Sequence, residues 1–165
     1  MSLLKLEIDP DKFRKFGLKK RQLNNAVKES LQAMGAHWWR EFLPLHFTEG
    51  AYARYRYSSR KGMRLDPIAS AYRRSYVARK LRLKRHNRPL VYSGEGMRLA
   101  VGMLRLRGTN REAKVVLPSK FNFQNRKSRI SMRDELTRII PAEAKQLVEV
   151  GRRQLRIAIA RPPKT

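Results

Sequence analysis

The sequence has no cysteine among its 165 residues, and it has few acidic residues. Disulfide bonds and thiolate metal sites are therefore excluded, as is common in a reducing compartment. Only 13 Asp and Glu stand against 39 Lys and Arg, so the formal net charge is +26. Hydrolases that use paired carboxylates or carboxylate-bound metals need several acids converging in one cleft. The composition argues against enzymes of those kinds.

Long apolar runs are absent as well. No stretch approaches the roughly 20 apolar residues of a membrane-spanning helix, and residues 1–5 lack the apolar region of a signal peptide. We therefore expect a soluble protein with no membrane partner. Hydrophobic residues still make up 41% of the chain, which is enough to bury a core at this length.

The excess of positive charge is the strongest feature that is present. A chain this basic repels itself, and binding to a polyanion relieves that repulsion by releasing counterions. DNA or RNA is the usual polyanion, and an acidic protein surface is the second candidate.

Apolar spacing predicts a long amphipathic helix over residues 23–42, which Pro44 ends or kinks. The apolar residues recur at steps of three or four, which places them on one helical face. They are Leu23, Val27, Leu31, Met34, Trp38 and Phe42.

Several short strands are predicted from alternation. Residues 4–8 alternate apolar and charged side chains, which predicts one short strand. Residues 104–107 and 113–117 flank a turn at 108–110, which is typical of a β-hairpin. Residues 119–130 are predicted to be a polar loop.

The C-terminal region is predicted to be helical. Ser131 is a candidate N-cap, followed by Asp134 and Glu135 in a first turn. Pro141 suits the first turn of a second helix that runs to Ile159. Its predicted buried face consists of Ala144, Val148, Gly151 and Leu155, with Leu147 and Ile159 beside it. Together these elements predict a single α+β domain over 1–165, with both long helices packed on a small antiparallel sheet.

Residues 48–87 form a basic insertion or arm in this prediction, irregular over 48–66 and helical over 67–84. In its first part Tyr52, Tyr55 and Tyr57 alternate with Arg54, Arg56 and Arg60. Exposed tyrosines among arginines suit stacking on single-stranded nucleic acid, and they equally suit an assembly interface. Both interpretations stay open. The predicted assembly residues are Tyr52, Tyr55, Tyr57, Tyr72 and Tyr76; the predicted polyanion contacts are Arg54, Arg56, Arg60, Arg73, Arg74, Arg79, Lys80 and Arg85.

No motif for catalysis, a metal or a cofactor is found, so we expect a non-enzymatic protein. His37, His46 and His86 lack the spacing of zinc ligands and are interpreted as structural or solvated. Residues 93–96 lack the ending of a phosphate loop and are interpreted as a turn that opens a short helix. A nuclease built on Glu49, Asp66 and Glu95 is a minor alternative.

The order of elements resembles that of tailed-bacteriophage neck proteins, the tail-completion and head–tail connector group. The similarity lies in the long helix ending at Phe42-Leu43-Pro44, in the proline-to-glycine segment 88–98 before the hairpin, and in the closing helix 141–159. The basic arm departs from the compact pattern of that family.

The resemblance implies a virion protein without catalytic residues, located at the neck or tail top and in the host cytoplasm before assembly. Its implied partners are copies of itself in a ring and neighbouring portal, adaptor or tail proteins, with DNA on the path through the ring as a further partner. The alternative is a cellular DNA- or RNA-binding protein without sequence preference, such as a ribosome-associated factor.

Overall fold

The computed structural model describes residues 4–5, 20–102, 105–117, 119–122, 124–125 and 130–161. These residues have the predicted α+β fold. The chain divides into two compact units, which are described here one at a time. Unit 1 consists of Met1–Phe42, Met103–Leu117 and Ile139–Thr165, and unit 2 consists of Leu43–Gly102 and Pro118–Arg138. The sequence predicted one domain with an insertion at 48–87, and that segment lies wholly within unit 2.

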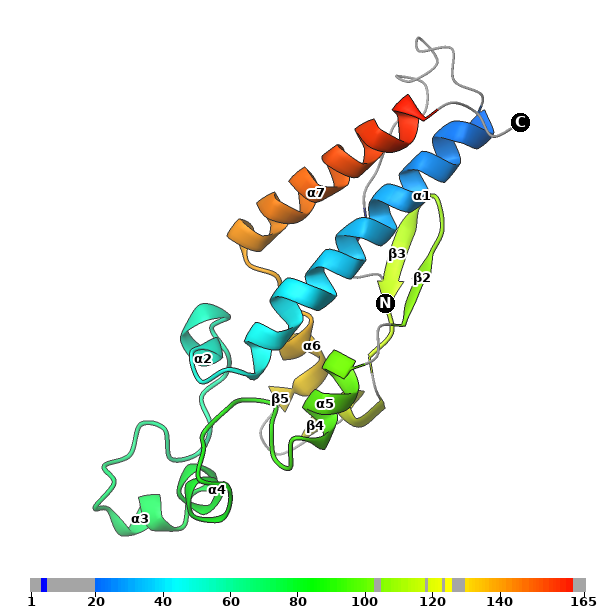
Figure 1. The fold of residues 1–165 in the computed structure, drawn as a ribbon. Coiled ribbons are helices and arrows are strands. Elements are labelled where there is room, and N and C mark those ends of the chain that lie inside the picture. Colours follow the sequence, from blue (N-terminus) through cyan, green and yellow to red (C-terminus); the bar gives the residue numbers. More distant parts are fainter. Residues whose placement is uncertain are drawn as a thin grey trace. The chain divides into compact units, whose positions relative to one another are not determined.

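Unit 1 is built around helix α1 (Lys20–His37), which continues into a π-helical turn, η2 (Trp38–Phe42). Helix α7 (Pro141–Ala160) runs antiparallel along α1, and the hairpin strands lie against another side of α1 (Figure 1). Prediction placed both long helices on the sheet, whereas α1 packs on both the strands and α7.

The sheet of unit 1 has three antiparallel strands in the order β1-β3-β2. They are β1 (Leu4–Lys5), β2 (Leu106–Gly108) and β3 (Glu112–Val115). The predicted hairpin is confirmed, with Leu106 opposite Val115 and Gly108 opposite Ala113. The predicted strand 4–8 is found at its first two residues; residues 6–8 lie outside the described part of the chain.

All six apolar residues predicted for the face of the first helix are buried, each at most 7% exposed. Their spacing of three and four residues repeats with the helical turn and so gathers them on one side. The helical geometry changes at Trp38, before the predicted break at Pro44, which lies within the 3₁₀ helix η3 (Leu43–Phe47).

The backbones of α1 and α7 come close at Gly151. A Cβ there would lie 2.5 Å from Met34 Sδ, and the Ser30 hydroxyl donates a 2.7 Å hydrogen bond to the Gly151 carbonyl. The buried residues of α7 are Glu143, Leu147 and Gly151, so the predicted face was wrong at Ala144, Val148 and Leu155, which are half-buried.

The shift of the α7 face has a local cause. The Glu143 carboxylate turns back to accept a 3.4 Å hydrogen bond from the Ile140 N–H, which is the capping-box arrangement. This contact keeps Glu143 on the buried side, and Leu147 and Gly151 follow it at intervals of four residues.

Unit 2 consists of short elements. After η3 come α2 (Ala51–Arg54), α3 (Ser70–Arg73), α4 (Tyr76–Lys84) and α5 (Glu95–Gly102). Later in the chain are the 3₁₀ helix η4 (Ser119–Asn122), the antiparallel pair β4 (Gln124–Asn125) and β5 (Ile130–Ser131), and α6 (Met132–Leu136).

Two predictions for unit 2 need correction, and one is confirmed. The helix predicted over 67–84 is two helices, because Ser75 begins α4 by accepting a 3.2 Å hydrogen bond from the Ala78 N–H. The predicted polar loop 119–130 contains η4 and strands, with Phe121 buried; Phe123 lies outside the described residues. The Ser131 N-cap is confirmed by a 3.2 Å bond from the Asp134 N–H.

Candidate polyanion-binding surface

A run of positive charge that contains no acidic residue covers α3, α4 and the segment up to Arg88. Residues 67–94 include eight Lys or Arg and no Asp or Glu. All but one of these cations are exposed, so their charges face solvent. The exposed ones are Arg73, Arg74, Arg79, Arg82, Lys84, Arg85 and Arg88.

Helix α4 is the rigid support of this surface. Its first turn is capped by Ser75, and its last turn carries Arg82 and Lys84, where cations interact favourably with the helix dipole. Arg85 ends the helix with a left-handed backbone, φ 55°, and its N–H bonds to the Leu81 carbonyl at 2.8 Å. The exposed cations of α4 are therefore held on a helix with defined ends.

Lys80 is the exception on α4, since its side chain is buried. Its ammonium group donates to the Arg88 carbonyl and lies 5.7 Å from the centre of the Tyr76 ring. Burial, together with the charge of Arg60, lowers the pKa of Lys80 to about 8. The prediction that Lys80 contacts a polyanion is wrong, because the side chain instead joins α4 to the segment that follows it.

Two tyrosines border the α4 cations. Tyr76 is 42% exposed and Tyr92 is 47% exposed. The ammonium nitrogen of Lys84 lies 5.1 Å from the centre of the Tyr92 ring, a cation–π contact. Tyr72 is half-buried. Tyr92 was not predicted as a surface residue, and only its place after a cation-rich helix could have indicated it.

The tyrosines of the predicted arm lie inside unit 2. Tyr55 is 1% exposed and Tyr57 is 7% exposed, whereas Tyr52 is half-buried and meets Tyr57 edge to face at 6.2 Å. The imidazole of His46 stacks on Tyr55 at 3.8 Å, and its Nδ1 forms a hydrogen bond with the Tyr57 hydroxyl. The prediction of exposed tyrosines is therefore wrong for Tyr55 and Tyr57.

Burial makes His46 a neutral core residue. Desolvation lowers the pKa of His46 to about 3, with a smaller opposite effect from a backbone hydrogen bond with Glu135. Burial raises the pKa of the Tyr57 hydroxyl, and the carboxylate of Glu135 adds to this effect. The interpretation of His46 as structural is confirmed by its position in the core of unit 2.

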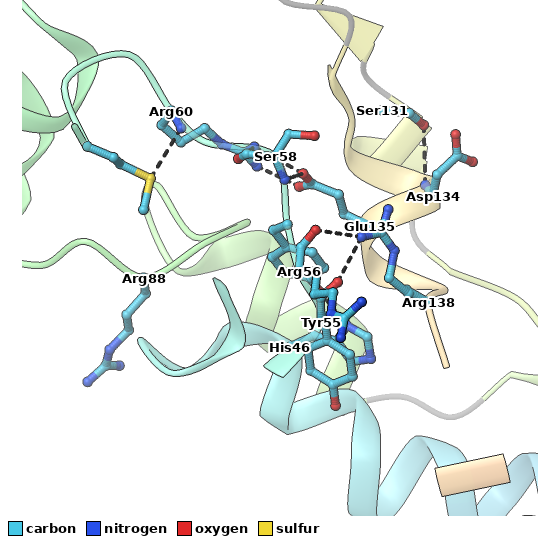
Figure 2. A network of polar contacts seen from close by, with 12 residues as sticks. His46, Tyr55, Arg56, Ser58, Arg60, Arg88, Ser131, Asp134, Glu135 and Arg138 are labelled. Atoms are coloured by element: carbon cyan, nitrogen blue, oxygen red, sulfur yellow. Dashed lines mark hydrogen bonds and ion pairs between the residues drawn. The ribbon is translucent and has the colours of Figure 1, made fainter. Parts of the chain in front are cut away.

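A buried ion pair holds the segment after Tyr57 to α6 (Figure 2). The guanidinium of Arg60 bonds both carboxylate oxygens of Glu135, at 2.5 and 3.0 Å. Glu135 also accepts a 3.2 Å bond from the Ser58 N–H. The side chains of Arg60 and Glu135 are only 11% and 5% exposed, so Arg60 is an internal residue and its predicted polyanion contact is wrong.

Arg138, just beyond the C-terminal end of α6, holds the same segment. Its guanidinium donates 2.7 Å hydrogen bonds to the carbonyls of Tyr55 and Arg56 (Figure 2). Arg56 has φ 50°, a conformation that costs a side-chain-bearing residue energy unless its surroundings hold it. The segment predicted to be an irregular arm is thus fixed to α6. The sequence did not single out Arg138, and it assigned Glu135 only to helix capping.

The predicted polyanion contacts consequently divide into two sets. Arg60 and Lys80 are internal. The others keep exposed side chains: Arg54, Arg56, Arg73, Arg74, Arg79 and Arg85.

The described residues hold no group of three or more His, Asp or Glu placed to bind a metal ion. Of the acids considered for a nuclease, Glu49, Asp66 and Glu95 are all exposed, and Asp66 accepts a 2.9 Å bond from the Ile68 N–H in a local turn. Among the helices of the described residues, none has the length and apolarity that crossing a bilayer requires.

The proline-to-glycine segment, residues 88–98, is buried near its start and becomes helical at its end. Pro89, Leu90 and Val91 are buried, and Leu90 and Gly94 have positive φ angles of 57° and 82°. As the sequence predicted, the turn opens a short helix, α5. An open, mostly apolar pocket of about 640 Å³ lies here; its lining includes Pro44, Met97 and Val101.

Comparison with family models, curated proteins and solved structures finds no match to this chain.

Proposed function

We propose that this chain is a non-enzymatic structural protein of the head–tail junction of a tailed bacteriophage. It acts by assembling into a neck, connector or tail-completion ring, with portal, adaptor or tail proteins as neighbours. It is made in the host cytoplasm and ends in the virion. The proposal combines the resemblance of its element order to that family with the surface of unit 2.

The observation that carries the assembly role is where large apolar side chains are exposed. In the described part of the chain ten such side chains are exposed, and eight of them lie between Met63 and Leu99 in unit 2. Exposed apolar groups in such numbers are typical of surfaces that meet another protein. The eight are Met63, Leu65, Ile68, Tyr76, Leu81, Leu83, Tyr92 and Leu99.

The segment 88–98 supports the same proposal. It is one of the parts of the chain that carry the family resemblance, and residues of α5 line the pocket near Pro44. A pocket with apolar walls next to the exposed Leu99 offers a subunit interface a concave surface.

Electron microscopy of particles made with and without the gene tests this function. Loss of the chain should leave filled heads apart from tails, or tails of wrong length. Complementation with Ile68→Glu/Leu83→Glu should fail in the same way, because these side chains are 80% and 53% exposed. Ile157→Glu, which changes a 46% exposed residue in unit 1, is the matched control and should complement. Normal particles without the gene would contradict the proposal.

A second candidate is a cellular nucleic-acid-binding protein without sequence preference. The acid-free stretch 67–94 favours it, since phosphate contacts alone supply affinity without base reading. That protein would bind tightly as a monomer, and removing its gene would leave particle assembly unchanged.

A further inference from the structure

We infer that the seven exposed cations between Arg73 and Arg88, which lie on and directly after helices α3 and α4, bind the phosphate backbone of duplex DNA together with Tyr76 and Tyr92. This set is called the α4 surface below. The inference rests on the proposed function for the choice of DNA, because a ring at the head–tail junction surrounds the path of the packaged duplex. The location of the surface follows from the described residues themselves.

The charge of the α4 surface needs a partner from outside the segment. Its seven exposed cations share a stretch of chain that has no carboxylate, whereas the buried Arg60 already has Glu135. Duplex DNA offers about one negative charge per 1.7 Å of axis, so it can place several phosphates near these cations at once.

The aromatic residues add contacts that suit phosphates. The Tyr76 hydroxyl is protonated at neutral pH, and burial raises its pKa further, so it can donate a hydrogen bond to a phosphate oxygen. The ring of Tyr92 holds the ammonium group of Lys84 at 5.1 Å. A partly immobilised cation loses less conformational entropy on binding than a free one.

The composition of α4 limits base reading to guanine, whose edge Arg and Lys can contact. Its sequence, Tyr76–Lys84, contains no Asn, Gln, Asp or Glu, the residues that pair with adenine or cytosine edges. Binding should therefore depend strongly on salt and weakly on sequence.

The experiment measures binding of the purified full chain to a 30-bp labelled duplex of mixed sequence, by fluorescence anisotropy across a salt series. The variant Arg79→Gln/Arg82→Gln/Lys84→Gln removes three exposed cations from α4. Its matched control, Arg152→Gln/Arg153→Gln/Arg156→Gln, removes three exposed cations from α7 in unit 1, so the two variants have the same net charge.

The α4 variant should lose about 10²-fold in affinity near 0.1 M salt, and its salt slope should fall by about 2.7, the value for three phosphate contacts. The α7 control should stay within about threefold of the parent chain. Equal losses in both variants would overturn the inference, because affinity would then follow net charge alone. So would no binding at 50 mM salt, which would leave an acidic protein as the partner of this surface.

Binding to single-stranded DNA of the same sequence, measured in the same way, tests whether the surface prefers duplex or single-stranded DNA. The inference expects the duplex to bind at least as tightly; a preference of more than tenfold for the single strand would overturn duplex DNA as the ligand. The result is also separable from the proposed function. Failed head–tail joining without DNA binding would retain the junction role and reject only this surface.

Discussion

Unit 1 is held together by the packing of two long helices and a small sheet, whereas the short elements of unit 2 are joined both by an apolar core and by a buried ion pair. In unit 1 the ion pair between Arg161 and Glu29 lies on the surface, with side chains 59% and 43% exposed. In unit 2 the pair between Arg60 and Glu135 is 11% and 5% exposed. The same type of interaction therefore has a different energetic role in each unit.

This difference between the two units indicates which part of the chain can present charged and apolar side chains to a partner. Unit 2 has a buried apolar core of its own, which includes Leu43, Phe47 and Phe121. It adds a buried network around Glu135 to that core and leaves many other apolar side chains exposed. Unit 1 hides most of its apolar residues along α1. A region that has a buried ion-pair network and an apolar, basic surface is suited to contact with a partner.

The largest expected effect comes from removing the negative charge of the network. Glu135→Gln leaves Arg60 buried without its counter-charge, which typically costs about 3–5 kcal/mol. Hydrogen exchange should show faster opening of residues 55–60 and α6, while α1 and α7 keep their protection. A change below about 1 kcal/mol in the unfolding free energy of unit 2 would show that the pair is dispensable.

A double variant sharpens this prediction. Arg60→Met/Glu135→Leu removes both charges and keeps apolar volume, an exchange that is often neutral or stabilising for buried ion pairs. It should recover most of the stability that Glu135→Gln loses. If the double variant were as unstable as the single one, the hydrogen bond from the Ser58 N–H to Glu135 would be the essential contact.

The second effect is acid sensitivity confined to unit 2. The pKa of His46 is about 3 in the folded chain and about 6.5 when unfolded, so the unfolded state takes up the proton first as the pH falls. The contribution of the neutral His46 to the free energy of unfolding is complete above pH 6.5. It is lost progressively down to pH 3, by about 1.4 kcal/mol per pH unit. At pH 5 the loss is about 2 kcal/mol.

NMR checks the acid prediction at the residue itself. The imidazole resonances of His46 should not titrate between pH 7 and 4, and amide exchange in α6 should accelerate over that range. Titration of His46 near pH 6 would contradict the buried, neutral imidazole that stacks on Tyr55.

The third effect lies in unit 1, at the close approach of α1 and α7. Gly151→Ala places a Cβ 2.5 Å from Met34 Sδ; overpacking of this kind costs about 1–3 kcal/mol, offset by about 1 kcal/mol of helix propensity. A net loss of up to about 2 kcal/mol is expected in thermal unfolding. Gly102→Ala is the control, since no atom lies within 4 Å of its added Cβ, and it should be neutral or stabilising.

The contrast between the units also explains what the sequence could predict. The α1 core and the hairpin follow from local periodicity, because side chains three or four residues apart share a helix face and alternate residues share a strand face. The Ser131 cap is equally local. Even the break before α4, within the single helix predicted over 67–84, has a local signal in Ser75, because serine favours helix N-caps.

The network of unit 2 could not be predicted in this way. Arg60 and Glu135 are separated by 75 positions, and no periodicity links them. Tyr55 and Tyr57 follow a pattern that fits an exposed interface as well as a core, and the choice depends on whether His46 and Arg138 come from elsewhere to meet them. Lys80 is of a residue type that is normally exposed. It is buried here because its ammonium group donates a hydrogen bond to the Arg88 carbonyl.

The smallest effect is expected at the surface ion pair of unit 1. Arg161→Gln removes the 3.2 Å contact with Glu29, and exposed pairs of this kind contribute about 0.2–1 kcal/mol, less in salt. Urea unfolding of the variant should therefore differ from that of the parent chain by no more than about 0.5 kcal/mol at low salt and should coincide with it at 0.5 M NaCl. Glu29→Gln should behave alike, and the double variant should show no further loss if the pair is the only interaction removed. A loss comparable to that of Glu135→Gln would mean that exposure does not separate the ion pairs of the two units, and the comparison between them would fail at its first premise.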